Sequence, residues 1–520
     1  MKRTQVQLAA IWSVSIWPAL NFTARNWADV VNDGVLAFGG VISATLLLGL
    51  IGHVFHRWSS KRGFGGFAVV MCLVAICLFF GYSLIHDATA ALFGRFYLDL
   101  PPSMGWVVCA VVLMLVVIRF RRHEGLQIAA GVFCFTAMAL ALGQLALTAI
   151  RNPKMRLEAP AVIGAPSAPV VAKPAGMNIY YILLDFYAGE AELREFTGFD
   201  NSGFMRAMAQ RGLVDVTQRG TESVRSNYLI TQQTVGAIFS LDYPKTDDPN
   251  TWGDPSNLYP YVINGARVPP LVVGLKAAGY STWETFNSWS GCSGRHMRCL
   301  GGQGSLDFDY MTMAFLAPTP LGRAINVLLG RRVDGLVAIA THLPALMNSK
   351  EPFFVFVHSL ATHPPYFPGA DCSPRGKTDD EFDGGSQYAR TSYAAAVKCV
   401  DTKVIELVDR IISGNPNAMI VIQSDHGSAF TADWELPISS WPDSFVRERS
   451  SFINLIKAPS ACAAWLDRPL GQVNTARFVL GCAQGRQPEF LPQRTYLASY
   501  SKAASNRAIV RMDQRKALRN

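Results

Sequence analysis

Two short stretches decide the fold of this chain: NIYYILLDFY at residues 178–187 and AMIVIQSDHG at residues 418–427. Each begins with a continuous apolar run rich in β-branched and aromatic residues, which predicts a strand buried on both faces of a sheet. The first run, Asn178–Leu184, ends at Asp185, and the second, Ala418–Gln423, is followed by Ser424, Asp425 and His426. The two stretches therefore predict an α/β domain with polar side chains where its strands end.

Further apolar runs alternate with helical patterns around these stretches. We expect strands at Ser281–Phe286 and Phe353–His358, and helices near Ser202–Arg211, Leu271–Ala278 and Ser392–Ile412. Strands that alternate with helices favour a mostly parallel central sheet covered by helices on both faces. In such sheets ligands bind beyond the carboxyl ends of the strands. Asp185, residues 358–363 and the Asp425–His426 pair all fall there.

The first 150 residues hold most of the apolar excess of a 520-residue chain that is 50% hydrophobic. A membrane-spanning helix needs roughly 20 apolar residues. Five stretches meet or approach that length: Val6–Phe22, Val35–Val54, Phe64–Ile85, Ser103–Ile118 and Leu126–Ile150. The first of them is either a spanning helix or a signal peptide. We favour a span because it lacks a small-residue cleavage site.

The charges between these stretches predict an orientation in the membrane. If the N-terminus lies in the cytoplasm, the cytoplasmic connections carry the basic clusters at 56–62 and 119–122. The opposite connections carry fewer basic residues beside several acidic ones: Arg25, Asp29, Asp33, Asp87, Arg95 and Asp99. Cytoplasmic loops of membrane proteins are enriched in Lys and Arg. Five spans therefore make this a multi-pass protein of a bacterial inner membrane, with everything after Ile150 in the periplasm. Buried helices of a soluble protein would not explain this charge pattern.

The composition predicts three parts: a transmembrane helical domain at 1–150, a linker at 151–176 and a periplasmic catalytic domain at 177–520. The linker contains five prolines among Ala and Gly, a composition typical of extended segments. The formal charge of +9 suits anionic lipid or phosphate substrates. Nucleic acid is not an expected partner, because no long basic run with interleaved aromatic residues occurs.

The ten cysteines divide into two groups. Four lie within the apolar stretches, and six lie in the outer part: Cys292, Cys299, Cys372, Cys399, Cys462 and Cys482. An even number of cysteines in an exported domain favours disulfides, and pairing sequence neighbours is the simplest arrangement. The alternative is a zinc site at Cys292 and Cys299, with His296 between them. It is less favoured because the chain has no CxxC motif.

Three groups of residues have a chemical interpretation beside a structural one. Asp185 is either a turn or cap residue or a metal ligand. Asp425 and His426 either form a turn or bind one divalent ion through oxygen and nitrogen. Thr231 stands near the start of an apolar helical segment, where a hydroxyl commonly caps the helix. With a metal beside it, the same hydroxyl is placed to attack phosphorus.

Histidines and three other polar residues complete the candidate site. His363 lies among rigid prolines just after a strand, where it is placed to bind a phosphate oxygen or protonate a leaving group. His358, at the end of that strand, binds substrate or is structural. Substrate-binding roles are also considered for Trp289, Asn474 and Arg477. The alternatives are a turn, a helix cap and a surface charge, respectively.

Taken together, the segments from about Asn178 to Tyr500 resemble the alkaline phosphatase and sulfatase superfamily. NIYYILLDFY, SNYLITQQ, HPPYF, QSDHG and VNTARF are similar to membrane-anchored sulfatase-like proteins. The chain lacks the Cys/Ser-x-Pro-Ser-Arg motif from which sulfatases make their nucleophile. Thr231 and Thr234 instead resemble the Thr-x-x-Ser segment of phosphoethanolamine transferases and lipoteichoic acid synthases, which have five membrane spans and an outer catalytic domain.

This resemblance implies a set of site residues. Asp185, Thr231, Asp425 and His426 match the ligands of one divalent ion, zinc or manganese, with magnesium as a third candidate. Thr231 matches the nucleophile, and His363 matches the phosphate-binding histidine. Two positions depart from the transferase pattern: Asp185 stands where those enzymes usually have Glu, and Thr362 replaces a Ser.

The resemblance also implies a reaction. A phosphoethanolamine or phosphoglycerol group moves from a membrane phospholipid to Thr231, and then to an envelope glycan or glycolipid. The expected partners are the phospholipid donor, the glycan acceptor and the lipid bilayer. If water is the acceptor, the protein is a phosphodiesterase or phosphatase. A sulfatase-type hydrolase and a non-catalytic glycan-binding or scaffold protein are further alternatives.

Overall fold

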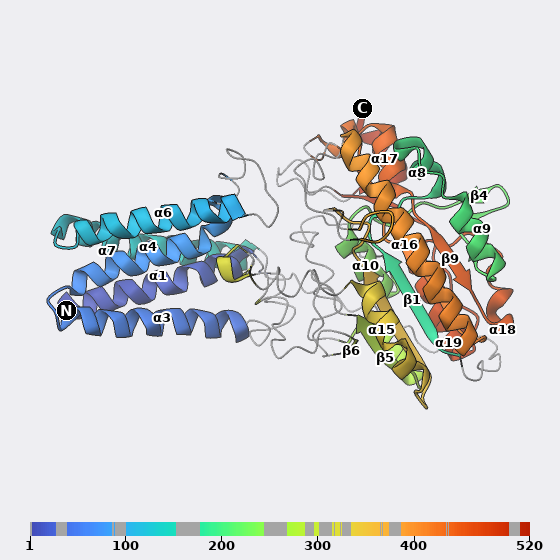
Figure 1. Ribbon diagram of the computed structural model, residues 1–520, viewed down its shortest axis with the longest axis horizontal. Coiled ribbons are helices and arrows are strands. Elements are labelled where there is room, and N and C mark those ends of the chain that lie inside the picture. The colour runs from blue at the N-terminus through green and yellow to red at the C-terminus, as the bar shows by residue number, and fades with distance from the viewer. Residues whose placement is uncertain are drawn as a thin grey trace. The chain divides into compact units, whose positions relative to one another are not determined.

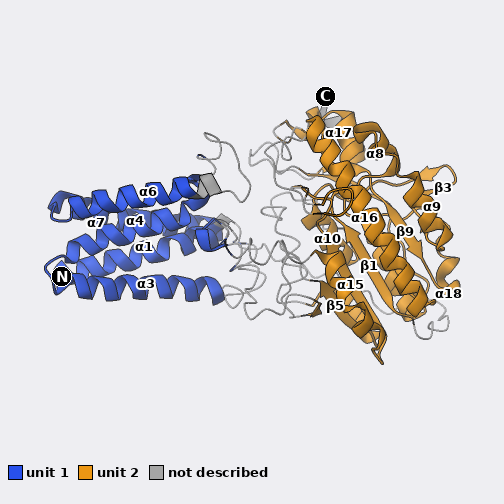
Figure 2. Cartoon of the chain, viewed as in Figure 1, with its two compact units in different colours: residues 1–156, 308–328 blue, residues 157–307, 329–520 orange. Residues whose placement is uncertain are grey.

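The computed structural model divides the chain into two compact units (Figure 2): residues 1–156 with 308–328, and residues 157–307 with 329–520. The structure describes residues 3–25, 27, 39–85, 88, 100–151, 177–243, 268–285, 296–300, 312, 315–316, 318–322, 324, 334–364, 366, 368–373, 386–432, 434, 436–498 and 510–519. The predicted linker therefore lies almost wholly outside the described residues, and the predicted domain bounds stay a prediction.

The first unit is built from long apolar helices. They are α1 (Arg3–Arg25), α3 (Gly39–Ser60), α4 (Gly65–Phe80), α6 (Leu100–Arg119) and α7 (Glu124–Arg151). Helix α1 packs against α3, α4 and α7 (Figure 1). Small residues allow this close approach, because a Cβ on Gly49 of α3 would lie 2.2 Å from the ring of Trp12 in α1. Such contacts are typical of helices that associate in lipid.

A helix occurs at each of the five predicted spans, but the five-span arrangement itself stays a prediction. Gly39–Ser60 and Glu124–Ile150 are long and apolar enough to cross a membrane. On α3, large apolar side chains remain exposed, including Leu47 at 58% and Leu50 at 55%. Water does not favour a continuous apolar face of this kind, whereas lipid does.

One segment from the middle of the sequence packs within the first unit. Phe315 contacts the rings of Phe22 and Phe80, with centroids 5.4 and 5.1 Å away. The backbone N–H of Ser83 donates to the carbonyl oxygen of Pro318. The predicted periplasmic domain included residues 308–328, so this packing was not anticipated from the sequence.

The second unit is organised around a seven-stranded sheet in the order β2-β9-β8-β1-β7-β5-β6. Its strands are β1 (Ile179–Leu184), β2 (Val214–Asp215), β5 (Ser281–Thr285), β6 (Arg298–Leu300), β7 (Phe353–Ser359), β8 (Met419–Ser424) and β9 (Asn454–Lys457). The pairs β8–β1, β1–β7, β7–β5 and β5–β6 are parallel, whereas β9 runs antiparallel to both of its neighbours. The predicted mostly parallel sheet is thus confirmed as a mixed sheet with one reversed strand.

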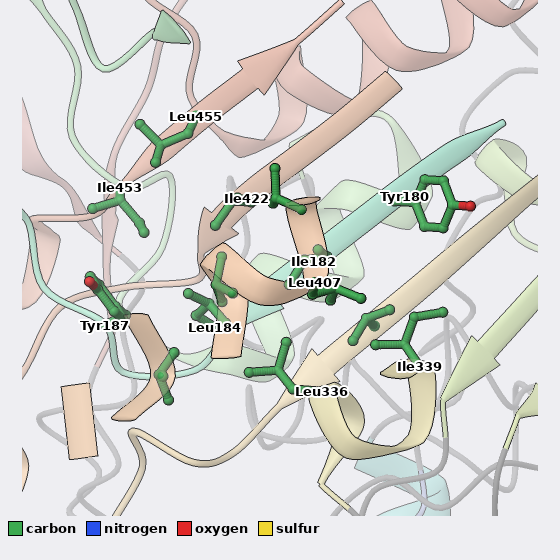
Figure 3. Packing of buried hydrophobic residues seen from close by; sticks show 14 of the residues in the cluster. Tyr180, Ile182, Leu184, Tyr187, Leu336, Ile339, Leu407, Ile422, Ile453 and Leu455 are labelled. Atoms are coloured by element: carbon green, nitrogen blue, oxygen red, sulfur yellow. The ribbon is translucent and has the colours of Figure 1, made fainter. Parts of the chain in front are cut away.

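Helices cover both faces of this sheet, as its doubly buried strands require. Along β1, Tyr180, Ile182 and Leu184 point to one core, and the residues between them point to the other. The first core is covered by α8 (Glu190–Thr197), α9 (Ser202–Gln210), α15 (Gly335–Met347) and α16 (Gln387–Gly414). The second is covered by α10 (Thr231–Ser240), α12 (Pro270–Ala277) and α19 (Gln472–Gln484). Figure 3 shows Ile182, Leu184 and Ile422 among the side chains of the first core.

Shorter elements complete this unit. They are β3 (Gln218–Arg219), β4 (Glu222–Ser223), η5 (Ile438–Ser440), α17 (Asp443–Ser450), α18 (Ser460–Ala463), β10 (Tyr496–Leu497), β11 (Val510–Arg511) and η7 (Met512–Arg519). Helix α17 matters most for function, because its last turn reaches the candidate site described below.

Two of the three predicted disulfides are confirmed. Cys372 pairs with Cys399, and Cys462 pairs with Cys482, with Cα–Cα separations of 5.0 and 5.7 Å. Cys299 lies on β6, whereas Cys292 lies outside the described residues. The four cysteines in the apolar helices are free thiols. The two confirmed bridges agree with an oxidising compartment for the second unit.

Candidate active site and metal centre

The register of the sheet brings the two candidate carboxylates together. Leu184, the last residue of β1, pairs with Ser424, the last residue of β8. The next residues, Asp185 and Asp425, therefore leave neighbouring parallel strands at the same edge. Asp185, Asp425 and His426 are buried, and one potential ligand atom from each lies within 4.8 Å of the others.

Thr231 joins this cluster from the start of another element. It is the first residue of α10 and is only 4% exposed. Its Oγ1 lies 2.9 Å from Nε2 of His426. Because the start of a helix carries unpaired backbone N–H groups, the Thr231 hydroxyl lies where a helix favours negative charge.

Each carboxylate has one oxygen held by the protein and one oxygen left for a ligand. Oδ1 of Asp425 accepts the backbone N–H groups of Phe186, at 3.0 Å, and His426, at 2.9 Å. Oδ2 of Asp185 lies 3.2 Å from Nε2 of His358. Within the described residues, Oδ1 of Asp185 and Oδ2 of Asp425 accept no hydrogen bond although they are buried. Buried carboxylate oxygens without donors are expected where a cation binds.

The imidazole of His426 also presents a lone pair to this space. Its Nδ1 lies 3.2 Å from the carbonyl oxygen of Gly427, which can only accept, so Nδ1 carries the proton. Nε2 is then an acceptor, yet it lies 2.9 Å from Oδ2 of Asp425. Both atoms therefore lie where one cation can contact them. Carboxylate oxygens with imidazole nitrogen form a donor set that suits zinc or manganese, so the residues fit the implied metal.

The ionisation of the pair agrees with this donor set. Burial lowers the pKa of His426, and the neighbouring Arg449 guanidinium lowers it further. Burial raises the pKa of Asp425, but the adjacent His426 outweighs burial, and the pKa of Asp425 falls below its usual value. A neutral imidazole and an ionised carboxylate are the forms that bind metal.

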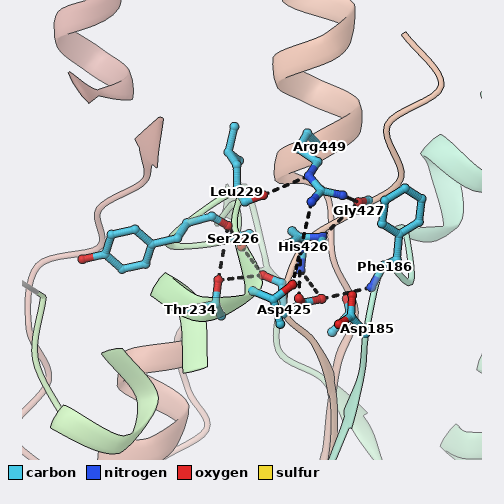
Figure 4. Close-up of polar contacts among 12 residues, drawn as sticks. Asp185, Phe186, Ser226, Leu229, Thr234, Asp425, His426, Gly427 and Arg449 are labelled. Carbon is cyan, nitrogen blue, oxygen red and sulfur yellow. Dashed lines mark hydrogen bonds and ion pairs between the residues drawn. The ribbon is translucent and has the colours of Figure 1, made fainter. Parts of the chain in front are cut away.

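Surrounding side chains, among them Ser226 and Thr234 in Figure 4, hold the backbone of Asp425 in place, and Thr362 holds that of Asp185. The carbonyl oxygen of Asp425 accepts hydrogen bonds from the side chains of Ser226, Thr234 and Gln472. The Thr362 hydroxyl donates to the carbonyl oxygen of Asp185 at 2.5 Å. Thr362 therefore fixes the backbone of Asp185 from the position at which the transferase pattern has Ser.

Phe186 connects these groups through an unusual backbone conformation. Its φ of 67° lies in the left-handed region, which is uncommon for a bulky residue. This conformation directs its N–H to Asp425 and places its ring beside those of His363 and His426, with centroids 5.5 and 6.0 Å away. Backbone strain of this kind concentrates at functional sites. No local sequence pattern indicates this conformation.

The other predicted site residues separate into two groups. His363 is exposed beside Phe186, and His358 is buried against Asp185. By contrast, Asn474 bonds the backbone of Leu491, and Arg477 bonds the carbonyl oxygens of Leu241 and Glu489. These contacts are structural and do not bring Asn474 or Arg477 to the cluster. Trp289 lies outside the described residues.

Four residues at the site were not anticipated from the sequence: Phe186, Ser226, Gln472 and Arg449. Arg449 is the most consequential, because its Nη2 lies 3.0 Å from Nε2 of His426. It lies in the polar segment RERSS, which by composition alone would belong on a solvated helix. Gln472 directly precedes the VNTARF segment that carries part of the resemblance. This position was the only feature of the sequence that pointed to a role for Gln472 at the site.

Residues 222–445 match the family model named Sulfatase, which confirms the expected resemblance to the alkaline phosphatase and sulfatase superfamily. The matched range contains Thr231, His363, Asp425 and His426. No curated protein matches the chain.

Several solved structures are similar to this chain. Lipooligosaccharide phosphoethanolamine transferase A from Neisseria meningitidis is 16% identical, with 92% of this chain and 96% of that chain covered and a TM-score of 0.41. The periplasmic domain of EptC from Escherichia coli is 15% identical, with 66% and 96% covered and a TM-score of 0.41. Lipoteichoic acid synthase LtaP from Listeria monocytogenes is 12% identical, with 64% and 81% covered and a TM-score of 0.34. With TM-scores below 0.5, these likenesses add nothing to the family-model match.

Proposed function

We propose that this chain, whose residues 222–445 match the sulfatase family, is a metal-dependent phosphoryl-group transferase of the cell envelope. In this proposal it moves a phosphoethanolamine or phosphoglycerol group from a membrane phospholipid to a glycan or glycolipid. The observation that carries the proposal is the position of Thr231. Its Oγ1 lies 2.9 Å from His426 Nε2, at a helix start and beside two buried carboxylates.

The first half-reaction forms a covalent link to the protein. Thr231 Oγ1 attacks phosphorus and loses its proton, the bond from phosphorus to the diacylglycerol oxygen breaks, and diacylglycerol leaves with a proton. The phospho-head group stays on Thr231. A divalent ion held by Asp185, Asp425 and His426 would lower the pKa of the hydroxyl and neutralise charge on the phosphoryl oxygens. In the second half-reaction, an acceptor hydroxyl displaces Thr231 from phosphorus and releases its oxygen as the hydroxyl.

His363 is placed to handle protons at the rim of this site. Its Nδ1 lies 2.6 Å from the carbonyl oxygen of Pro364, which can only accept a hydrogen bond. Nδ1 therefore carries a proton, and Nε2 is the nitrogen that can take up or release one. This arrangement suits proton donation to a leaving oxygen, or a hydrogen bond to a phosphate oxygen.

The first unit supports a lipid as the donor. Its apolar helices include two that are long enough to span a bilayer, and α3 carries exposed leucines. An enzyme fixed to the membrane meets phospholipid at high local concentration, so a lipid head group is an accessible phosphoryl donor there. The proposed location is the bacterial inner membrane, with the second unit in the periplasm.

A hydrolase is the second candidate, and the match to the sulfatase family favours it. The same residues would then release the head group to water. Because the chain lacks the Cys/Ser-x-Pro-Ser-Arg motif, its nucleophile in either reaction would be Thr231 and not a modified cysteine.

The two candidates are separated by following a labelled head group. Purified full-length protein with Zn²⁺ is incubated with head-group-labelled phosphatidylethanolamine or phosphatidylglycerol and an envelope glycolipid extract. The transferase releases diacylglycerol and leaves the label on glycolipid, whereas a hydrolase leaves the label in water. Thr231→Ala should abolish both products, while Thr402→Ala, on the exposed face of α16, should retain them. Equal turnover by Thr231→Ala and the parent protein would refute the proposed nucleophile.

A further inference from the structure

A buried arginine lies directly against the proposed metal ligands. Arg449, in the last turn of α17, is 2% exposed. Its Nε donates to the carbonyl oxygen of Leu229 at 2.9 Å, and its Nη1 donates to that of Gly427 at 2.8 Å. Its guanidinium lies over the ring of Phe186 at 4.8 Å and that of Trp434 at 5.5 Å. Within the described residues, no carboxylate forms an ion pair with it.

The third contact of the Arg449 guanidinium is with the His426 nitrogen that would bind the metal. Nη2 of Arg449 lies 3.0 Å from Nε2 of His426, the nitrogen that carries the lone pair (Figure 4). When a cation takes that lone pair, Nη2 loses its acceptor. The two carbonyl contacts still hold Nε and Nη1, so the guanidinium cannot move far. Its free N–H groups then face the space beside the metal.

The guanidinium itself shows what that space would hold. Arg449 carries a permanent positive charge and is buried, and its N–H groups are strong donors to anionic oxygens. Because the site is buried, this charge is weakly screened and acts strongly on a bound anion.

We propose that Arg449 binds a non-bridging oxygen of the substrate phosphoryl group and stabilises the charge on it during transfer. This inference rests on the proposed function and adds to it a residue that recognises the phosphoryl group. The alternative is a structural role, in which Arg449 only joins the carbonyl oxygens of Leu229 and Gly427.

Anion binding and metal binding separate these two roles. Zn²⁺ affinity is measured by chelator competition, and inorganic phosphate affinity by calorimetry on the zinc-loaded full-length protein. Both are measured in a Thr231→Ala background, so neither depends on turnover. Arg449→Gln should weaken phosphate binding by about 10- to 100-fold, because hydrogen bonds to charged groups are strong. It should not weaken Zn²⁺ binding, because it removes a positive charge beside the metal.

Matched variants complete the test. Arg447→Gln, on the same helix, removes an exposed arginine that pairs with Glu195. Because exposed ion pairs contribute little energy, the zinc and phosphate affinities of this variant should both stay within about twofold of the parent values. Arg449→Lys keeps the charge without the planar fork and should weaken phosphate binding about fivefold or more. If Arg449→Gln does not fold, the lysine variant decides. Unchanged phosphate affinity in the Arg449 variants would overturn the inference. Parallel losses of zinc and phosphate affinity in Arg449→Lys would also overturn it. Loss of phosphate binding alone would uphold it even if no transfer is ever observed.

Discussion

Gly427 follows the metal-binding pair directly, and the structure predicts that it tolerates no side chain. A Cβ at this position would lie 2.1 Å from the carbonyl oxygen of Glu448, 2.5 Å from Ser451 Oγ and 2.9 Å from the Ser451 carbonyl oxygen. Two of these atoms belong to the backbone and cannot rotate away. Ordinary van der Waals contact begins at 3.4 Å, so the Glu448 carbonyl would have to retreat by more than 1 Å.

The expected cost of Gly427→Ala follows from two terms. Overpacking a tight site costs about 1–3 kcal/mol. The retreat also disturbs two hydrogen bonds: the Gly427 N–H donates to the Arg449 carbonyl oxygen, and the Arg449 guanidinium donates to the Gly427 carbonyl oxygen. Loss of a buried bond costs about 1–3 kcal/mol. We expect a total loss of about 2–6 kcal/mol, which lowers the Tm by on the order of 10 °C. Zinc affinity should fall as well, because His426 is displaced.

The assay is thermal unfolding by circular dichroism, together with zinc titration, beside a matched glycine variant. A Cβ on Gly203, in α9, would have no atom within 4 Å. Gly203→Ala should therefore be neutral or stabilising by up to about 1 kcal/mol. The steric explanation is refuted if Gly427→Ala and Gly203→Ala melt at the same temperature and bind zinc equally well.

Three further predictions concern single groups. Asp185→Asn removes a charge and a ligand oxygen, and it should weaken Zn²⁺ binding by more than about 100-fold in chelator competition. Even the loss of a residue that only supports a metal ligand weakens metal binding by about 10- to 100-fold. Unchanged zinc affinity would remove Asp185 from the ligand set. Burial raises the pKa of Glu284 to about 8, so the folded state keeps a proton that the unfolded chain loses above its ordinary carboxyl pKa. Stability should therefore decline as pH rises through that window, by up to about 1.4 kcal/mol per pH unit, and Glu284→Gln should remove this part of the slope in urea titrations at several pH values. The Cys462–Cys482 bridge closes 20 residues, so replacing both cysteines with serine should cost about 3 kcal/mol in the same titration; an unchanged midpoint would contradict that expectation.

The parts of the fold that rest on long apolar runs could be predicted. The strands β1 and β8 were expected within a residue of their ends, because six consecutive buried residues leave a clear pattern. The carboxylates that follow them were therefore placed correctly at one sheet edge. Strands β2 and β9, with two and four residues, are too short to produce such a pattern.

The remainder of the site depends on tertiary contacts that sequence patterns do not contain. Arg449 stands in a polar helix, and nothing local indicates that the side chain is buried between Phe186 and His426. Likewise, Gln472 reaches the Asp425 carbonyl from 47 residues away. In contrast, Asn474 and Arg477 were considered because they match a family block, and their observed contacts are structural.

The central claim is that Thr231 is the nucleophile, and the intact mass of the protein tests it most directly. Purified full-length protein with Zn²⁺ is incubated with phosphatidylethanolamine or phosphatidylglycerol, beside Thr231→Ala. We predict a mass increase equal to one phospho-head group, present in the parent protein, absent from Thr231→Ala and localised to Thr231 by peptide mapping. A parent protein that releases diacylglycerol while its mass never changes, or an adduct that persists in Thr231→Ala, would contradict the claim.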